Sequence, residues 1–222
     1  MTRRIVQTLI ASTALAILPL SQACAGDTTD GESDIVNNQV TFSDSISHVN
    51  IDIGNMWGDY SAQSVAGGNS LDVTTMQDTS VTNNQYTQAG SIAADLNANA
   101  RQVSGDVDLS AQAFCNNASI STDPTSTQVY SSQECHASDP STAVNATVAD
   151  VAGNVSVSGS SIGNSFEEDT NAPNAPVQNY QLNDSNLAAT VNSSVWNVKG
   201  SVNIQGAAIG NSAQIIHYNT GN

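Results

Sequence analysis

Small aliphatic and polar residues alternate along most of this chain, in short runs that are interrupted by glycine. Val202 and Ile204 follow Gly200, and Val155 follows Gly153 in the same way. A period of two that brings β-branched residues to alternate positions is typical of β-strands. Glycine adopts the positive φ that tight turns between strands require. The pattern therefore predicts an all-β protein.

The same pattern recurs in a frame of about 47 residues. A glycine marks each copy, one asparagine stands eight positions before it, and another stands eleven positions after it. The twelve residues are Asn50, Gly58, Asn69, Asn97, Gly105, Asn116, Asn145, Gly153, Asn164, Asn192, Gly200 and Asn211. A unit with so narrow an apolar strip cannot bury that strip alone, so the copies must stack. We expect a loose segment at residues 26–45, followed by a β-solenoid, similar to a β-helix, of four repeats over residues 46–222.

The sequence leaves several details of the repeat open. Each copy forms one large coil or two small ones, and successive hairpins packed as a β-sandwich are the alternative architecture. The asparagines form hydrogen-bonded ladders along the stack or fill turns. The later Gly-Asn pair predicts a turn, which a more variable segment follows. Strand-like pieces occur in that segment at residues 85–88, 128–130 and 178–181.

The N-terminus carries the pattern of an export signal. Arg3 and Arg4 precede an apolar stretch at residues 5–20, and Ala23-Cys24-Ala25 provides a cleavage site with small residues. We interpret residues 1–25 as a secretory signal peptide. No later stretch of 18 apolar residues follows, so we expect no transmembrane anchor.

An exported chain reaches an oxidising compartment, where cysteines form disulfides. Cys115 and Cys135 are the two cysteines that remain after cleavage of the signal, and we predict that they form a disulfide. Cys24 supports an alternative, because a lipoprotein would be cleaved just before this cysteine and acylated on it. The residues before Cys24 lack the aliphatic residue that such sites carry, so export without lipidation is the simpler interpretation.

Charge and composition narrow the function classes. Twenty acidic residues stand against four basic ones, which gives a formal net charge of −16. Phosphate backbones and anionic membranes attract clustered Lys and Arg, so this balance argues against nucleic-acid and anionic-membrane partners. Hydrophobic residues make up 39% and aromatic residues 5% of the chain. So lean an interior suits stacked coils, in which every coil shares its apolar face with the next.

The sequence contains no convincing catalytic or cofactor motif. Residues 159–163 match the nucleophile elbow G-x-S-x-G, but they lie inside the repeat and no helix is expected after them. We therefore predict neither an enzyme nor a cofactor. Asp106 and Asp108 would point to one face of a strand and are the candidate pair for Ca²⁺.

With these features in place, the repeat resembles those of known surface proteins. Residues 202–216, with Gly210-Asn211 and the small aliphatic residues after it, look like curlin-type repeats, and Gly163-Asn164-Ser165 and Gly68-Asn69-Ser70 echo them. The chain is also similar to the holdfast-anchoring surface proteins of stalked bacteria. These resemblances imply an adhesive component that forms fibres or amyloid-like, curli-like assemblies. The longer period and the cysteine pair differ from curlins, so an anchoring subunit fits as well as a polymerising one.

We therefore expect an exported, non-enzymatic structural or adhesive protein of the bacterial outer surface, which crosses the periplasm in transit and serves in biofilm adhesion. Its partners would be further copies or other exported surface subunits, and residues 215–219 form a strand-like segment for such pairing. The alternative function is a module that binds surface polysaccharide. Trp57, Tyr60 and Trp196 are then the candidates for stacking against sugar rings.

Overall fold

The computed structural model describes residues 26–27, 33–122, 127–172 and 175–218, and every regular element in these ranges is a β-strand. The strands are β1 (Gly26–Asp27), β2 (Ser33–Thr41), β3 (Ser45–Met56), β4 (Tyr60–Thr75), β5 (Thr79–Thr87), β6 (Ile92–Val103), β7 (Val107–Thr122), β8 (Thr127–Cys135), β9 (Pro140–Val151), β10 (Val155–Thr170), β11 (Val177–Asn183), β12 (Ala188–Val198) and β13 (Val202–His217). The prediction of an all-β protein is confirmed. The predicted signal peptide and Cys24 lie outside the described residues.

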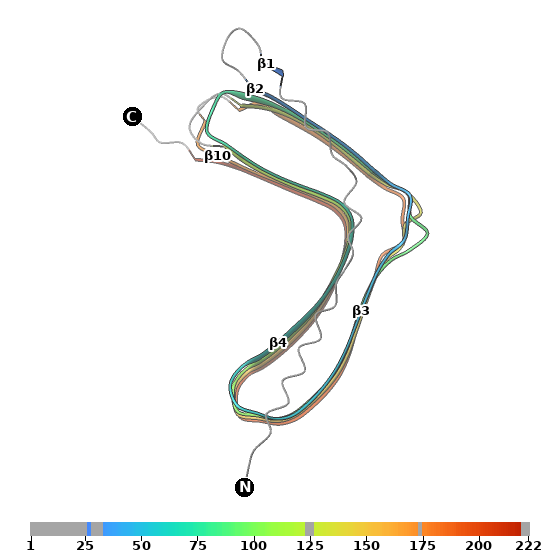
Figure 1. Ribbon diagram of the computed structural model, residues 1–222, viewed down its shortest axis with the longest axis vertical. Coiled ribbons are helices and arrows are strands. Elements are labelled where there is room, and N and C mark those ends of the chain that lie inside the picture. The colour runs from blue at the N-terminus through green and yellow to red at the C-terminus, as the bar shows by residue number, and fades with distance from the viewer. Residues whose placement is uncertain (1–25, 28–32, 123–126, 173–174, 219–222) are drawn as a thin grey trace.

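Three parallel sheets run along the molecule, and each takes one strand from every turn of the chain (Figure 1). Sheet A contains β2, β5, β8 and β11, sheet B contains β3, β6, β9 and β12, and sheet C contains β4, β7, β10 and β13. The short strand β1 pairs antiparallel with β2 at the edge of sheet A. Strands β2–β4 thus form coil 1, β5–β7 coil 2, β8–β10 coil 3 and β11–β13 coil 4.

Neighbouring strands pair in the register of the sequence frame. Asn97 lies between Asn50 and Asn145 in sheet B, and the steps between these residues are 47 and 48 residues. The chain therefore makes one large coil per frame rather than two small ones. With about 4.8 Å between adjacent coils, the four strands of a sheet span about 14 Å. Hairpins would pair antiparallel, and among the described residues only β1 and β2 do so, so the sandwich alternative is wrong.

Each coil has a bent outline, because the strands of sheet C change direction about halfway along their length (Figure 1). The first half of sheet C faces sheet B, and a cluster of Ala, Val, Ile and Leu side chains, including Leu96, Leu109 and Val148, fills the space between them. The second half faces sheet A across a smaller cluster that contains Ile120 and Phe166. The apolar interior is thus divided into two lobes that meet at the bend.

The Gly-Asn pairs of β4, β10 and β13, and the equivalent Cys115-Asn116 of β7, lie at this bend, inside strands of 16 residues. Inward and outward side chains alternate along each strand, but at the bend two consecutive residues, such as Gly163 and Asn164, are both buried. Pairing with the neighbouring coil continues on both sides, from Ile162 with Phe114 to Asn164 with Asn116. The predicted turn at Gly-Asn is therefore wrong, because the chain changes direction without leaving the sheet.

The earlier glycine of each frame lies in the turn between sheets B and C. Gly58 has a φ of 105°, which side chains with a Cβ rarely adopt. In the next coil, a Cβ on Gly105 would lie 2.5 Å from the carbonyl of Gly58. These turns stack so closely that the backbone of one coil fills the space that a side chain on the glycine of the next coil would need.

Residues 33–41 differ from the loose segment that we expected at residues 26–45. They form β2, which pairs with β5 along its whole length. Asn37 is buried and donates from Nδ2 to Oδ1 of Asn83 at 2.8 Å. The first coil thus begins before the first glycine of the frame, in the part of the sequence that varies most between copies.

Candidate functional site: ladders and the open end of the stack

An exposed asparagine ladder, with one side chain per coil bonded to the next, runs along the outer face of sheet B. Asn97 donates from Nδ2 to Oδ1 of Asn50 at 2.8 Å, Asn145 donates to Asn97 at 2.9 Å, and Asn192 donates to Asn145 at 3.1 Å. The first three side chains line a shallow hollow. Water competes for exposed amides, so each of these bonds contributes little to stability.

A second asparagine ladder is buried at the bend of sheet C. Asn69 donates to Asn116 at 2.9 Å, Asn116 to Asn164 at 2.7 Å, and Asn164 to Asn211 at 2.8 Å. The same Nδ2 groups also donate to backbone carbonyls of sheet A, as Asn116 does to Glu134 at 3.0 Å. Of the two interpretations of these asparagines, ladder or turn filler, the structure shows the ladder.

A buried glutamine ladder lies beside it, on the inner face of sheet A. Gln85 donates from Nε2 to Oε1 of Gln39 at 3.1 Å, Gln133 donates to Gln85 at 2.8 Å, and Gln181 donates to Gln133 at 2.8 Å. Each glutamine also donates to a carbonyl of sheet C, as Gln133 does to Ser165 at 2.8 Å. The glutamines of this ladder recur in the frame, but they were not predicted because they lie in the segment whose sequence varies between copies.

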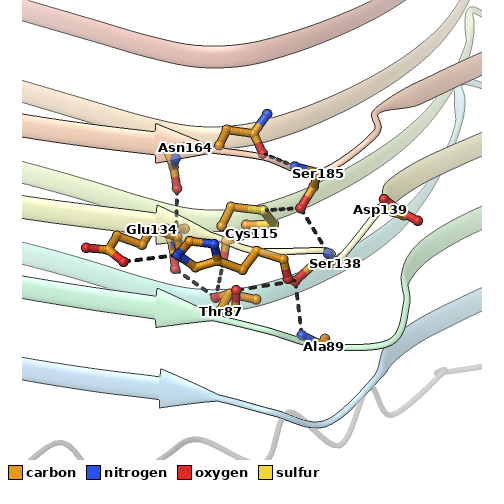
Figure 2. Close-up of a disulfide and its surroundings, with 12 residues drawn as sticks. Thr87, Ala89, Cys115, Glu134, Ser138, Asp139, Asn164 and Ser185 are labelled. Carbon is orange, nitrogen blue, oxygen red and sulfur yellow. Dashed lines mark hydrogen bonds and ion pairs between the residues drawn. A yellow bond between two sulfur atoms is a disulfide. The ribbon is translucent and has the colours of Figure 1, made fainter.

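The disulfide Cys115–Cys135 crosses from sheet C to sheet A at the same bend, as predicted (Figure 2). The Cα atoms are 5.8 Å apart and the cysteines are 20 residues apart in sequence. The equivalent place one coil earlier holds Gly68 and Thr87, where a Cβ on the glycine would lie 2.7 Å from the threonine Oγ1. The bend therefore accepts either a glycine opposite a polar side chain or a cysteine pair.

The corner between sheets A and B carries a histidine between two carboxylates. His136 Nε2 lies 3.0 Å from Glu134, and Nδ1 lies 2.9 Å from Asp184 of the next coil. Hydrogen bonds to Glu134 and then to Asp184 raise the pKa of His136. Below this corner, the hydroxyl of Ser138 accepts the backbone N–H of Ala89 at 3.0 Å (Figure 2). These contacts hold the corners of three successive coils together.

The structure brings each histidine to a carboxylate, and no sequence motif predicts these pairs. His48 lies 2.9 Å from Asp95, and His217 Nε2 lies 3.3 Å from Oε2 of Glu168. Glu168 is fully buried in the smaller lobe, where Oε2 makes the ion-pair contact with His217 and Oε1 has no hydrogen-bond partner among the described residues. Burial raises the pKa of Glu168, against the opposing effect of His217.

The three aromatic residues proposed for sugar stacking lie in different places. Trp57 is 82% exposed at the turn between β3 and β4, and Trp196 is 48% exposed on the outer face of sheet B. Tyr60 points inward and is buried, so the proposal that its ring is free for stacking is wrong. Burial raises the pKa of Tyr60 to about 12. Val107 and Val155 occupy the same position in the next two coils and are core residues. These valines were the sequence signal that Tyr60 is buried.

The candidate calcium and nucleophile residues have structural surroundings. Asp106 accepts the backbone N–H of Asn154 at 2.7 Å, whereas Asp108 lies exposed on β7. Across the described residues, no three His, Cys, Asp or Glu side chains gather as metal ligands would. Ser161, the serine of the G-x-S-x-G match, is buried inside β10 and donates to the carbonyl of Ala188.

Coil 4 leaves the end of the stack open. β11, β12 and β13 are each the last strand of their sheet in the described structure. Val202 and Ile204 of β13 are 47% and 46% exposed, whereas Val155 and Val157, which precede them in the same columns, are 1% exposed. The apolar columns of the core therefore run out to solvent at this end.

Comparison with known proteins assigns the chain to a family. Residues 18–173 match the family of holdfast attachment protein D, HfaD, over more than half of the chain. The chain belongs to this family. The match ends between β10 and β11, so coil 4 lies beyond the part of this HfaD-family chain that matches. No curated protein and no solved structure matches significantly.

Membership confirms the resemblance to holdfast-anchoring surface proteins and supports a role in adhesion at the cell surface, in association with other surface components. A search of the described part of the HfaD-family chain for a helix long and apolar enough to cross a membrane finds none. The residues that stand out for such a role are the ladders, the open coil 4 and the exposed aromatic side chains.

Proposed function

We propose that this protein is an exported, non-enzymatic subunit of a cell-surface anchor whose coils stack head to tail on further copies of the chain. One observation carries the proposal: the core columns and the three sheets reach coil 4, and none of the described residues covers its far side. Unpaired parallel edges of 7, 11 and 16 residues together with exposed apolar side chains favour addition of another strand to each sheet. Coil 1 of a second copy offers β3 and β4, with 12 and 16 residues, and the part of the nine-residue β2 that lies beyond Ser33 and Asp34, which pair with β1.

The direction of the amide ladders supports this head-to-tail order. Along the glutamine ladder each Nε2 donates towards coil 1, so Gln181 presents its Oε1 at the open end and Gln39 presents Nε2 at the other. Along the buried asparagine ladder the donors point the opposite way, so Asn211 presents Nδ2 at the open end and Asn69 presents Oδ1 at the other. Both ends thus carry matching donors and acceptors for a second copy in the same frame.

Electron microscopy and fibre diffraction of residues 26–222 test this function. Ordered fibres with a reflection at about 4.8 Å along the fibre axis are expected, because every coil would repeat at the strand spacing. A chain that stays monomeric at high concentration, with no fibres after prolonged incubation, would contradict the proposal.

Export is part of this proposal. We propose that cleavage after Ala25 releases a chain that begins at Gly26, passes the periplasm, forms its disulfide there and reaches the outer surface. Mass spectrometry of the exported protein is expected to give the mass of residues 26–222 less two hydrogens. A chain that begins at an acylated Cys24 would show instead that the protein is a lipoprotein.

The second candidate function is binding of a surface polysaccharide. Exposed aromatic rings on a chain with few aromatic residues favour it, since such rings stack against the apolar faces of sugars. Retarded migration of the protein in native gels that contain a soluble polysaccharide tests this function.

A further inference from the structure

We propose that the outer face of sheet A binds an uncharged polysaccharide chain. This face consists of the outward-pointing side chains of β2, β5, β8 and β11. The proposal rests on the second candidate function and locates it on a surface other than those of Trp57 and Trp196. Three properties of the face support it: its aromatic side chains, its low charge and its size.

Aromatic residues are concentrated on this face, although they make up 5% of the whole chain. Tyr86, Tyr130 and Tyr180 all point outward from sheet A, and Tyr130 and Tyr180 are 37% and 54% exposed. Phe42 lies at the end of the face, with its ring centre 6.0 Å from that of Tyr86. The register places Tyr180 two residues and one coil from Tyr130, which corresponds to about 8 Å. Several rings are thus available along one ligand.

Amide groups surround these rings. Tyr86 donates from its hydroxyl to Gln88 Oε1 at 2.9 Å, and Gln128 donates to the hydroxyl of Tyr130. Asn84 and Asn38 form an outward amide pair at 2.8 Å. A sugar ring has apolar C–H faces and a rim of hydroxyls, so it is matched by rings that are flanked by neutral donors and acceptors.

The face is nearly uncharged on a strongly acidic protein. Glu134 is paired with His136 at 3.0 Å, and Asp34 lies at the rim, beside β1. The outer face of sheet C carries four carboxylates, which are Asp72, Asp108, Glu167 and Asp169. Sheet B carries Asp52 and Asp95, with Asp150 near the end of β9. A charged ligand would therefore find few oppositely charged side chains on sheet A, whereas an uncharged ligand needs none.

The size of the face favours a polysaccharide over a protein. Four strands of up to nine residues cover about 500 Å², at 4.8 Å between strands and about 3.3 Å per residue. A stable protein interface buries about 800 Å² on each partner. A polysaccharide chain is one sugar wide, so its length along the strands fits within this area.

Native gels cast with hydroxyethyl cellulose, laminarin, dextran or glycol chitin, each an uncharged polysaccharide, test the proposal on residues 26–222. We expect at least one polymer to retard the protein, and the double variant Tyr130→Ala, Tyr180→Ala to bind it at least about tenfold more weakly. The variant Trp57→Ala, Trp196→Ala is the matched control and is expected to bind as the original protein does. Tyr130→Phe, Tyr180→Phe keeps both rings and is expected to retain binding, which separates stacking from a folding defect.

Each other outcome overturns the proposal in a different way. Binding lost in the tryptophan variant but kept in the tyrosine variant moves the site to another face and leaves the second candidate function intact. No retardation by any of the four polymers overturns both. If the tyrosine variant instead loses self-association in sedimentation experiments, the face is covered by a second copy of the chain and not by a polysaccharide.

Discussion

Single residues contribute very differently to this fold, depending on whether their amides point inward or outward. Gln133 is fully buried and makes three hydrogen bonds, to Gln85, Gln181 and the carbonyl of Ser165. Asn145 also bonds to both neighbours in its ladder, but it is exposed. A buried polar group that loses its partner keeps the full cost of leaving water, whereas an exposed one bonds to water instead.

We therefore predict that Gln133→Ala lowers the free energy of unfolding by about 3 kcal/mol, because it leaves several buried groups without partners. The matched change Asn145→Ala is expected to cost at most about 1 kcal/mol. Urea unfolding of both variants, monitored by circular dichroism, measures the difference. Equal losses would show that the buried ladder contributes no more than the exposed one.

Glu168 predicts an unusual pH dependence. Its frame equivalents Val73, Ile120 and Ile215 are apolar, and burial raises its pKa above the ordinary value of 4.5. The folded protein then holds this proton more tightly than the unfolded chain does. The resulting stability is fully present below 4.5 and is lost as the pH rises through the raised pKa.

Glu168→Gln cannot ionise, so we expect it to lose less stability than the original protein as the pH rises from about 4 towards neutrality. Glu167→Gln, at the exposed neighbouring position, is the control and should follow the profile of the original protein. Unfolding free energies measured across this range check the prediction. Indistinguishable profiles for all three proteins would mean that Glu168 does not titrate differently on folding.

For Tyr60 and Glu168, the repeat contains information about burial that the prediction did not use. Tyr60 stands two positions after Gly58, where the other copies carry valines of the core. The repeat frame therefore predicts a buried side chain at this position. Glu168 carries the same kind of signal, because the other copies hold Val73, Ile120 and Ile215 at its position. A carboxylate in a polar run is usually exposed, so this signal conflicts with the residue type, and the packing of sheet A against sheet C shows that the side chain is enclosed.

At the level of elements, the spacing of glycine and asparagine was enough to predict strands, stacking and a shared register. It was not enough to show how the coil closes. The Gly-Asn pair predicts a turn because both residues favour turns, yet parallel pairing on both sides keeps the strand continuous through a bend. The strand-like pieces predicted at residues 85–88, 128–130 and 178–181 overlap with β5, β8 and β11 of sheet A. Their inward columns were not predicted, because the sequence of this segment varies between copies although the spacing of the columns is kept.

The disulfide gives a prediction about this bend. Cys115→Gly with Cys135→Thr copies the pair found one coil earlier, so the strands and their register should be retained. The loop that the disulfide closes spans 20 residues, and we expect its loss to cost about 3 kcal/mol. Thermal unfolding and circular dichroism measure both effects. Loss of the β-sheet spectrum at room temperature would show that the cysteine pair, and not the stacked frame, determines the bend.

For the molecule as described, the decisive property is that the described residues cover coil 4 on one side only. An interior built from small residues is stable where a coil is covered on both sides, and coil 4 is covered on one side. The same columns that bury Val155 and Val157 leave Val202 and Ile204 exposed. A second copy would complete those columns, whereas in a lone molecule they remain in contact with water.

Blocking the free edge of β13 tests whether assembly uses it. The N–H of Val155 donates to the carbonyl of Ser201, so alternate residues from Ser201 face β10, and Ala208 directs its N–H to the open side. Ala208→Pro removes this donor without removing a bond to β10, and it is expected to abolish fibres while the monomer keeps its unfolding temperature within a few degrees. Ala208→Ser retains the donor and should assemble as the original chain does. Electron microscopy of both variants at equal concentration gives the answer, and undiminished fibres of the proline variant would exclude β13 as the assembling edge.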